Sequence, residues 1–543
     1  SLPEGCSRLA ELDIPLGRFV RLKGSADADY PCLSFDAQHS ADSEYVLLFE
    51  NMSPTGGFSR ALFPGPPSDS VLEFTLNVSP LAALAQNTAA RQNAAFSFRL
   101  SVPHPDHDPG ASWDFGAGRI HEHIPELPAV PPAGAGLVRG SRIIDLNSAA
   151  ADPVPGDTIQ VLMDGIPRLG ISTGNQRAVI RYVSPALIIA EDVRLGTELM
   201  REDGGFNRPI AEADLAAIAA EYSAVARVQG DMFFENRHND AVEASVPHRV
   251  TAVHSLMSGD SVWGYTYSVT NYFVWDYWVA TDGSTKGLNQ HPQRVADNLF
   301  MHEIGHMRHF GMLRRNNLSI GDRGNRWLVE GFARFSERMP LAARLLGTTM
   351  PSRTGNVVLP RNPAFGNAYF LDDVPTYLNA GSSMYFGYHT SAFVFDYFAD
   401  QVALHGGDWL AAMREFLIAG GSRTALDAVV QRWLPGMTFA ELFTRSRIAL
   451  YADDIGTPGL PSWTQYHQYR LRESRPAPAH LAGQDPRAAW TRMSPSAEAS
   501  ISGTVAAGGA AGFVIDGAGA QSGLIRITAA PGPNATLSIA RVR

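Results

Sequence analysis

The first part of the chain carries short apolar runs that have the length of β-strands. These runs cover residues 45–50, 71–78 and 95–100, and turns rich in Gly, Pro, Asn and Ser separate them. Short runs of β-branched and aromatic residues between such turns are typical of strands. We therefore predict an N-terminal β-sandwich over residues 1–125.

A stretch rich in Pro and Gly follows and predicts a linker around residues 125–136. Behind it, residues 158–163, 177–183 and 187–192 again form apolar runs of strand length. We interpret residues 126–200 as a small, β-barrel-like module.

From about residue 201 the pattern changes to that of helices. Residues 212–226 are rich in alanine, which has the highest helix propensity. Further on, apolar residues and histidines recur at spacings of three and four, the stripe of an amphipathic helix. This stripe consists of Val295, Leu299, His302, His306 and Phe310.

Three more helices are predicted over residues 408–419, 425–434 and 439–451. Together with a strand signal around residues 249–254, these helices outline one domain over residues 201–456. A polar, proline-containing connector is predicted over residues 457–480. The strand pattern returns afterwards, so we predict a small C-terminal β domain over residues 481–543.

Composition narrows the class of protein. A length of 543 residues exceeds what one core usually supports, which agrees with several domains. The net charge of −10 and the absence of a basic run argue against a nucleic-acid partner. No apolar run approaches the roughly eighteen residues of a transmembrane helix. Lysine is rare and arginine abundant, which suggests a GC-rich bacterial genome. Separately, we expect the protein to be a monomer.

The start of the chain indicates export. Ser1 is not preceded by a basic and apolar leader, as in a mature protein whose signal has been removed. Cys6 and Cys32 are the only cysteines, and such a pair in a large chain predicts one disulfide and an oxidising compartment. Two unpaired buried thiols are the alternative. We expect a secreted, periplasmic or cell-surface protein.

The helical stripe contains a candidate zinc site. His302, Glu303 and His306 have the spacing His-Glu-x-x-His. Residues i and i+4 of a helix share a face, so both imidazoles can bind one Zn²⁺ ion while Glu303 reaches a water on that ion. The alternative is a buried helix with two packed histidines.

A second helix-like segment, residues 325–335, carries one acid among apolar neighbours. Its Glu330 is the candidate third ligand, because two His and one Glu form one of the standard catalytic zinc sets. A metzincin would need Gly and His where this chain has His309 and Met312, so that reading fails. The alternative for Glu330 is an exposed ion pair with Arg334.

The run Trp-Leu-x-Glu-Gly-x-Ala at 327–333, some twenty residues after His-Glu-x-x-His, resembles the gluzincin metallopeptidases. These include the membrane alanyl aminopeptidase family and the hyicolysin-like secreted peptidases. The resemblance covers about residues 211–454. It implies a thermolysin-like α+β zincin domain, flanked here by all-β N-terminal and C-terminal domains, with His302, His306 and Glu330 as ligands and Glu303 as general base.

Such gluzincins also use a tyrosine, written Tyr-x-x-Gly before an apolar helix, to stabilise the tetrahedral intermediate. Aligning the helix by Tyr397 implies that Tyr388 has this role, with Ser391 in place of the glycine. Tyr385 is the competitor and His389 is a possible second donor. The alternative is that these residues only pack.

Substrate contacts are expected just ahead of the zinc helix. An aromatic run over residues 263–267 and 272–278, which includes Trp275 and Tyr277, is predicted to form an edge strand and to hold an extended substrate by strand addition. Core packing is the alternative. Residues 230–236 resemble the Gly-x-Met-Glu-Asn loop of the alanyl aminopeptidases, but two extra residues interrupt the match. This departure favours cleavage of internal bonds.

We therefore predict a secreted, zinc-dependent endopeptidase that acts on proteins or peptides. Two alternatives stay open: an aminopeptidase of the same zincin type, and a zincin-like binding scaffold without hydrolysis.

Overall fold

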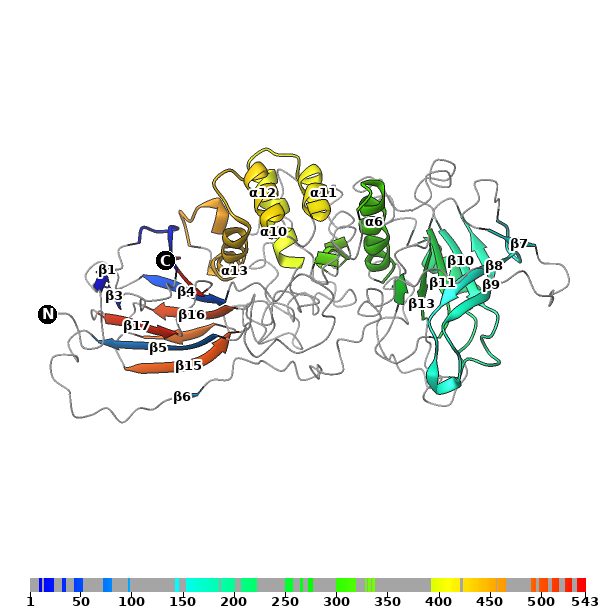
Figure 1. The fold of residues 1–543 in the computed structure, drawn as a ribbon, viewed down its shortest axis with the longest axis horizontal. Coiled ribbons are helices and arrows are strands. Elements are labelled where there is room, and N and C mark those ends of the chain that lie inside the picture. Colours follow the sequence, from blue (N-terminus) through cyan, green and yellow to red (C-terminus); the bar gives the residue numbers. More distant parts are fainter. Residues whose placement is uncertain are drawn as a thin grey trace. The chain divides into compact units, whose positions relative to one another are not determined.

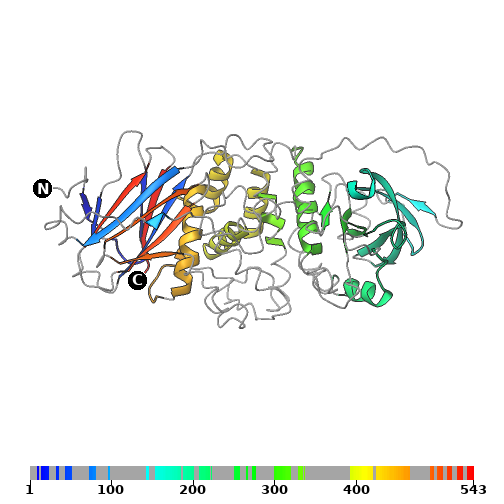
Figure 2. The same cartoon turned by 90° about the horizontal axis from the view of Figure 1, so that it is seen from below.

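The computed structural model divides into two units, shown in Figure 1 and Figure 2. Unit 1 contains residues 1–104, 352–409 and 423–543, and unit 2 contains residues 105–351 and 410–422. The residues whose structure is described are 9–11, 14–23, 32–35, 43–51, 72–80, 96–97, 142–145, 153–184, 187–200, 207–220, 222, 250–256, 264–266, 272–276, 299–318, 328–329, 331–333, 335–336, 392–419, 423–455, 457–464, 490–494, 498–505, 510–516, 523–529 and 535–543.

Unit 1 contains two sheets that draw strands from both ends of the chain. The first sheet has the order β1-β3-β17-β5-β15-β6, and the second has the order β14-β16-β4-β18-β2. The bounds of these strands are β1 Leu9–Glu11, β2 Phe19–Lys23, β3 Cys32–Phe35, β4 Glu44–Asn51, β5 Leu72–Pro80, β6 Phe96–Ser97, β14 Thr491–Met493, β15 Ala499–Val505, β16 Ala510–Asp516, β17 Gly523–Ala529 and β18 Ala535–Arg541.

The two sheets share one apolar core, so they form a β-sandwich. Phe74 of β5 lies 5.1 Å from Phe49 of β4 and 5.6 Å from Phe513 of β16, measured between ring centroids. The sequence predicted separate N-terminal and C-terminal β domains, and that division is wrong. Each terminal segment supplies only some strands: β4 lies between β16 and β18, and β5 lies between β17 and β15.

The outer face of β4 is covered by helix α13, Phe439–Ile455. All eight residues of β4 are buried, including two carboxylates. The Glu50 carboxylate accepts a bond of 2.6 Å from Thr444 and pairs with Arg447 at 3.2 Å, while Glu44 accepts a bond from Tyr451. Buried charges require such partners, so α13 and β4 depend on each other. Figure 1 shows α13 beside β4.

The connector predicted at 457–480 begins inside unit 1. Its first part contains the short helix η8, Ser462–Thr464. Trp463 donates a bond of 2.9 Å to the Gly17 carbonyl, and Tyr397 donates one of 2.6 Å to the Trp463 carbonyl. Residues 457–464 are therefore packed structure and not a free connector.

Other helices are α10 Ala392–Leu404, α11 Trp409–Ala419 and α12 Arg423–Trp433. The last two agree within two residues with helices predicted from the sequence. Among the described residues no helix has the length and apolar character that a membrane span requires.

Unit 2 is built on one seven-stranded sheet with the order β12-β13-β11-β10-β9-β8-β7. Its strands are β7 Ile143–Ile144, β8 Thr158–Met163, β9 Gly174–Val183, β10 Leu187–Asp192, β11 Val250–His254, β12 Gly264–Thr266 and β13 Tyr272–Trp275, and the short helix η4 is Pro167–Leu169. The predicted boundary at residue 200 is wrong, because β10 and β11 pair in parallel across it.

This sheet is strongly curved. The Tyr272 hydroxyl of β13 accepts a bond of 2.5 Å from the Leu162 amide of β8, and the Tyr265 hydroxyl of β12 accepts one of 2.7 Å from the Asp164 amide. Three strands separate β13 from β8 in the sheet order, about 19 Å in a flat sheet, beyond the reach of a tyrosine. The strands therefore curl towards each other, and the edge strand β12 is fixed from two sides.

Helix α6, Met301–Arg315, packs against this sheet. It ends five residues beyond the predicted stripe, and residues 291–298 lie outside the described residues. Residues 212–220 are helical and join the same core. The shared core consists of Leu187, Ile189, Ile210, Leu215, Ile218, Ala219, Tyr222, Val250, Ala252, Phe273, Trp275, Leu299, Phe300, Met301, Ile304 and Met307.

Candidate metal centre

The residues His302, Glu303 and His306 all lie in the first two turns of α6 and are buried. The two imidazoles face each other, with Nε2 atoms 3.1 Å apart and ring planes at 86°. His306 also stacks on Phe310, with an interplanar angle of 11°. The helix therefore brings both predicted histidine ligands to one point, as their spacing requires.

The separation of the two nitrogens fits a shared zinc ion. Zinc binds imidazole nitrogens at about 2.0–2.1 Å, so two ligands of a tetrahedral ion lie about 3.3 Å apart. The observed 3.1 Å is close to that value. Without an ion, one imidazole donates a hydrogen bond to the other.

The third predicted ligand, Glu330, lies outside the described residues. Within the part of the chain that the structure describes, no group of three or more His, Cys, Asp or Glu side chains forms a complete metal site. The whole ligand set therefore stays a prediction.

The helical residues next to Glu330 in sequence pack closely on α6. The contact is at Gly305, where an added Cβ would lie 2.8 Å from the Ser336 Oγ and 3.0 Å from the Ala333 Cα. Glycine costs about 1 kcal/mol in a helix relative to alanine, and this close approach is a reason for it here. Ala333 and Ser336 therefore lie against the turn of α6 that carries the histidines.

His309 is buried beside the same contact. Its ring lies 6.0 Å from that of Phe332 and 6.1 Å from that of Phe310. It takes part in the aromatic packing between α6 and the residues around 332.

On the other side of α6, Glu303 meets the edge strand β12. A Cβ added at Gly264 would lie 3.2 Å from the Glu303 Oε1. The candidate general base therefore lies directly against the backbone of the strand that the sequence predicted as a substrate edge.

Trp275 is not at that edge. Its side chain has no exposed surface, and its ring lies 5.0 Å from Phe300 and 5.5 Å from His254. The predicted substrate contact of Trp275 is therefore wrong, and the alternative of core packing holds. The aromatic run reads as strand in both cases, so the pattern could not separate them.

Several predicted residues lie outside the described residues: Tyr277, Tyr385, Tyr388, His389 and Cys6. Cys32 is disulfide-bonded and 1% exposed. The pairing of Cys6 with Cys32 stays a prediction.

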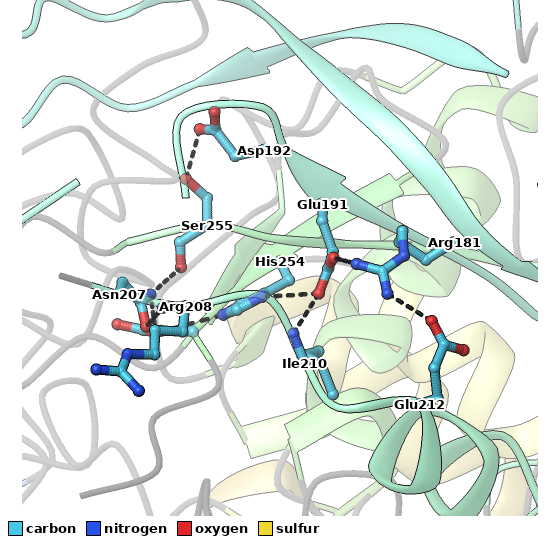
Figure 3. Close-up of polar contacts among 10 residues, drawn as sticks. Arg181, Glu191, Asp192, Asn207, Arg208, Ile210, Glu212, His254 and Ser255 are labelled. Carbon is cyan, nitrogen blue, oxygen red and sulfur yellow. Dashed lines mark hydrogen bonds and ion pairs between the residues drawn. The ribbon is translucent and has the colours of Figure 1, made fainter. Parts of the chain in front are cut away.

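The structure adds a buried polar network that the sequence analysis missed (Figure 3). The His254 ring lies between two carboxylates, with Nδ1 3.6 Å from the Glu191 Oε1 and Nε2 3.9 Å from the Asp276 Oδ1. Glu191 also pairs with Arg181 and accepts a bond of 2.5 Å from the Ile210 amide. The sequence pattern contained a signal for this network, since Glu191, His254 and Asp276 lie at the carboxyl ends of β10, β11 and β13, which pair in parallel.

Arg181 connects this network to a second acid, Glu212, at 2.5 Å. Burial by itself lowers the pKa of Arg181, but the bonds and charges of Glu212 and Glu191 outweigh it and the net pKa is raised. On the other side, Asn207 donates a bond of 2.8 Å to Asp276, and Ser255 donates one of 2.8 Å to Asp192. The network joins the carboxyl ends of β10, β11 and β13, next to the buried Trp275.

No family model matches the sequence, and no curated protein matches it. Among solved structures, the chain is similar to an M1 zinc metallopeptidase from Deinococcus radiodurans, crystallised with a Tyr-Ser-Ala substrate. The sequence identity is 12%, the TM-score is 0.26, and the match covers 58% of this chain. It covers 65% of that chain, so this chain spans less than two thirds of its length. This likeness is too distant to assign a fold or an activity.

Proposed function

We propose that the protein is a zinc-dependent peptidase of gluzincin type. The proposal rests on the buried pair of His302 and His306, whose Nε2 atoms lie 3.1 Å apart. Glu303 directly follows His302 on the same helix. Two packed histidines alone would not need an acid beside them, whereas hydrolysis needs a general base.

In this proposal His302, His306 and Glu330 would hold Zn²⁺, and the ion would supply a lowered pKa for a bound water and a positive charge beside the peptide carbonyl. Glu303 accepts the proton of the attacking water and passes it to the leaving amine. Tyr388, or in its place Tyr385 or His389, donates a hydrogen bond to the oxyanion.

The substrate in the proposal is a peptide or protein bound in extended form along β12. The described residues of this strand, Gly264, Tyr265 and Thr266, include no carboxylate. In the proposal the cleaved bond is internal, because the match of residues 230–236 to the amine-holding loop of the alanyl aminopeptidases is interrupted. We also propose that the protein is secreted, periplasmic or on the cell surface.

The test combines metal analysis with one matched pair of variants. We expect one zinc per chain, loss of peptide cleavage on chelation, and recovery on adding zinc. Glu303→Gln is expected to keep zinc and to lose cleavage of a peptide library by several orders of magnitude, because an amide cannot accept the proton.

Glu198→Gln, which changes an exposed carboxylate of the same unit, is the control and is expected to be fully active. A purified protein without zinc that also fails to take it up would refute the metal site. Zinc without cleavage of any peptide would favour the zincin-like binding scaffold.

A further inference from the structure

The edge strand β12 approaches the candidate base at Gly264. This residue pairs in the antiparallel ladder with Trp275 of β13, and its neighbours Tyr265 and Thr266 pair with Val274 and Phe273. Glu303 of α6 is 3% exposed, and its Oε1 would lie 3.2 Å from a Cβ added at Gly264, so its carboxylate faces this strand. The position of the strand therefore limits where the carboxylate can lie.

A side chain at Gly264 would crowd its neighbours. An added Cβ would lie 3.0 Å from the Leu299 Cδ1, 3.2 Å from the Glu303 Oε1 and 3.3 Å from the Val274 carbonyl oxygen. Contacts this short require the neighbours to move by a few tenths of an ångström. By contrast, Gly174 in β9 of the same sheet has nothing within 4 Å of an added Cβ.

The strand itself is poorly able to move away. The Tyr265 hydroxyl accepts a bond from the Asp164 amide, and the Thr266 hydroxyl donates one of 3.1 Å to the Tyr272 carbonyl. The ladder partner of Gly264, Trp275, is fully buried and packs on His254 of the polar network in Figure 3. The strain of an added Cβ therefore falls on Leu299 and Glu303.

From these contacts we infer that Gly264 is a positioning residue for the general base: its missing side chain lets the Glu303 carboxylate lie against the edge-strand backbone. The inference rests on the proposed function for the role of Glu303. It adds that the same backbone that would pair with an extended substrate also fixes the base beside it.

Gly264→Ala tests this inference in the full-length, zinc-loaded protein. Small misplacements of a reacting group cost up to about 100-fold in rate, so we expect kcat to fall about 10- to 100-fold. Zinc content is expected to stay unchanged, and kcat is expected to fall by a larger factor than KM rises, because the added methyl group meets Leu299 and Glu303 while the backbone groups of β12 that would pair with a substrate are kept. Gly174→Ala, the control, is expected to keep the wild-type kcat. A wild-type kcat in Gly264→Ala would refute the inference.

A double-mutant cycle separates positioning from general disruption. Gly264→Ala is expected to cause no further loss in a Glu303→Gln background, because the base is already absent. An equal loss in both backgrounds would overturn the inference. Adding Leu299→Ala relieves one of the short contacts and is expected to restore nothing, whereas full recovery would assign the effect to packing on Leu299.

Crystal structures of the wild-type protein and Gly264→Ala give a readout that does not depend on activity. We expect the Glu303 Oε1 to move by a few tenths of an ångström or more in the variant. An unmoved carboxylate would overturn the inference even if the protein cleaves no peptide. Absence of cleavage in the wild-type protein would instead refute the proposed function alone.

Discussion

Glycine at two positions lets the backbone approach the candidate site from both sides. Gly264 admits the Glu303 carboxylate to the edge strand, and Gly305 admits the residues around 333 to α6. Neither glycine has a positive φ among the described residues, so close contact and not backbone conformation is the reason for both. Tertiary packing therefore explains why glycine occupies both positions.

We predict that Gly305→Ala destabilises the protein although alanine is the better helix former. Helix propensity favours alanine by about 1 kcal/mol, but overpacking costs about 1–3 kcal/mol. The contacts with Ser336 Oγ at 2.8 Å and Ala333 Cα at 3.0 Å leave little room. Zinc affinity should fall as well, because Ala333 lies three residues after Glu330.

Urea denaturation and zinc titration of Gly305→Ala measure the two effects, with Gly174→Ala as the control. A variant that is more stable than the wild-type protein would show that the two helical segments are not tightly packed.

The histidine pair could be predicted from sequence because its geometry is local. Residues i and i+4 of a helix share a face in any fold, so His302 and His306 meet. Gly264 could not be found this way, since its partner Glu303 is 39 positions later in the sequence and only the tertiary fold brings them together. The substrate contact predicted for Trp275 was wrong for a related reason. An alternating aromatic strand has the same sequence pattern whether its side chains line a core or a binding site.

At the scale of elements, strands and helices with strong local patterns were predicted closely. The runs at 158–163 and 187–192 coincide with β8 and β10, and the run at 439–451 lies within α13. Pairing between strands was not predicted, because hydrogen-bonded partners such as β10 and β11 are far apart in sequence. The intervening residues gave no signal that one sheet continued across the predicted boundary.

We predict that the curl of the unit 2 sheet depends on Tyr272 and on pH. Burial raises the pKa of Tyr272 above its usual value, although the bond from the Leu162 amide lowers it in part. A raised folded-state pKa favours the protonated phenol. Its contribution to stability is therefore present below the unfolded-state pKa of about 10 and is lost as the pH rises further.

Tyr272→Phe leaves the Leu162 amide without its acceptor and should cost about 1–3 kcal/mol at neutral pH. Urea denaturation of both proteins from pH 7 to pH 11 measures the difference in unfolding free energy. We expect this difference to shrink above about pH 10. A difference that stays constant with pH would contradict the assignment of the effect to the phenol proton.

At the scale of the whole molecule, the two ends of the chain fold as one body. Both sheets of unit 1 contain N-terminal strands paired with C-terminal strands around one core, so neither segment can bury its apolar face alone. Domain boundaries drawn along the sequence could not show this, since each segment has the strand pattern of a small β domain. The described parts of unit 2 lie between these two segments in sequence.

We therefore predict that Phe74→Ala weakens both ends of the chain together. Phe74 is buried between Phe49 and Phe513, and removing a buried phenylalanine ring costs about 3–5 kcal/mol. Hydrogen exchange followed by mass spectrometry should show faster exchange in β16 and β18 as well as in β4 and β5. Val20→Ala, at a position 43% exposed on β2, is the control and should leave exchange unchanged. In a shared core, the loss of packing at Phe74 reaches the partners of β4 and β5 through the ladders that join them. Faster exchange confined to the N-terminal strands would therefore mean that the two terminal segments fold separately.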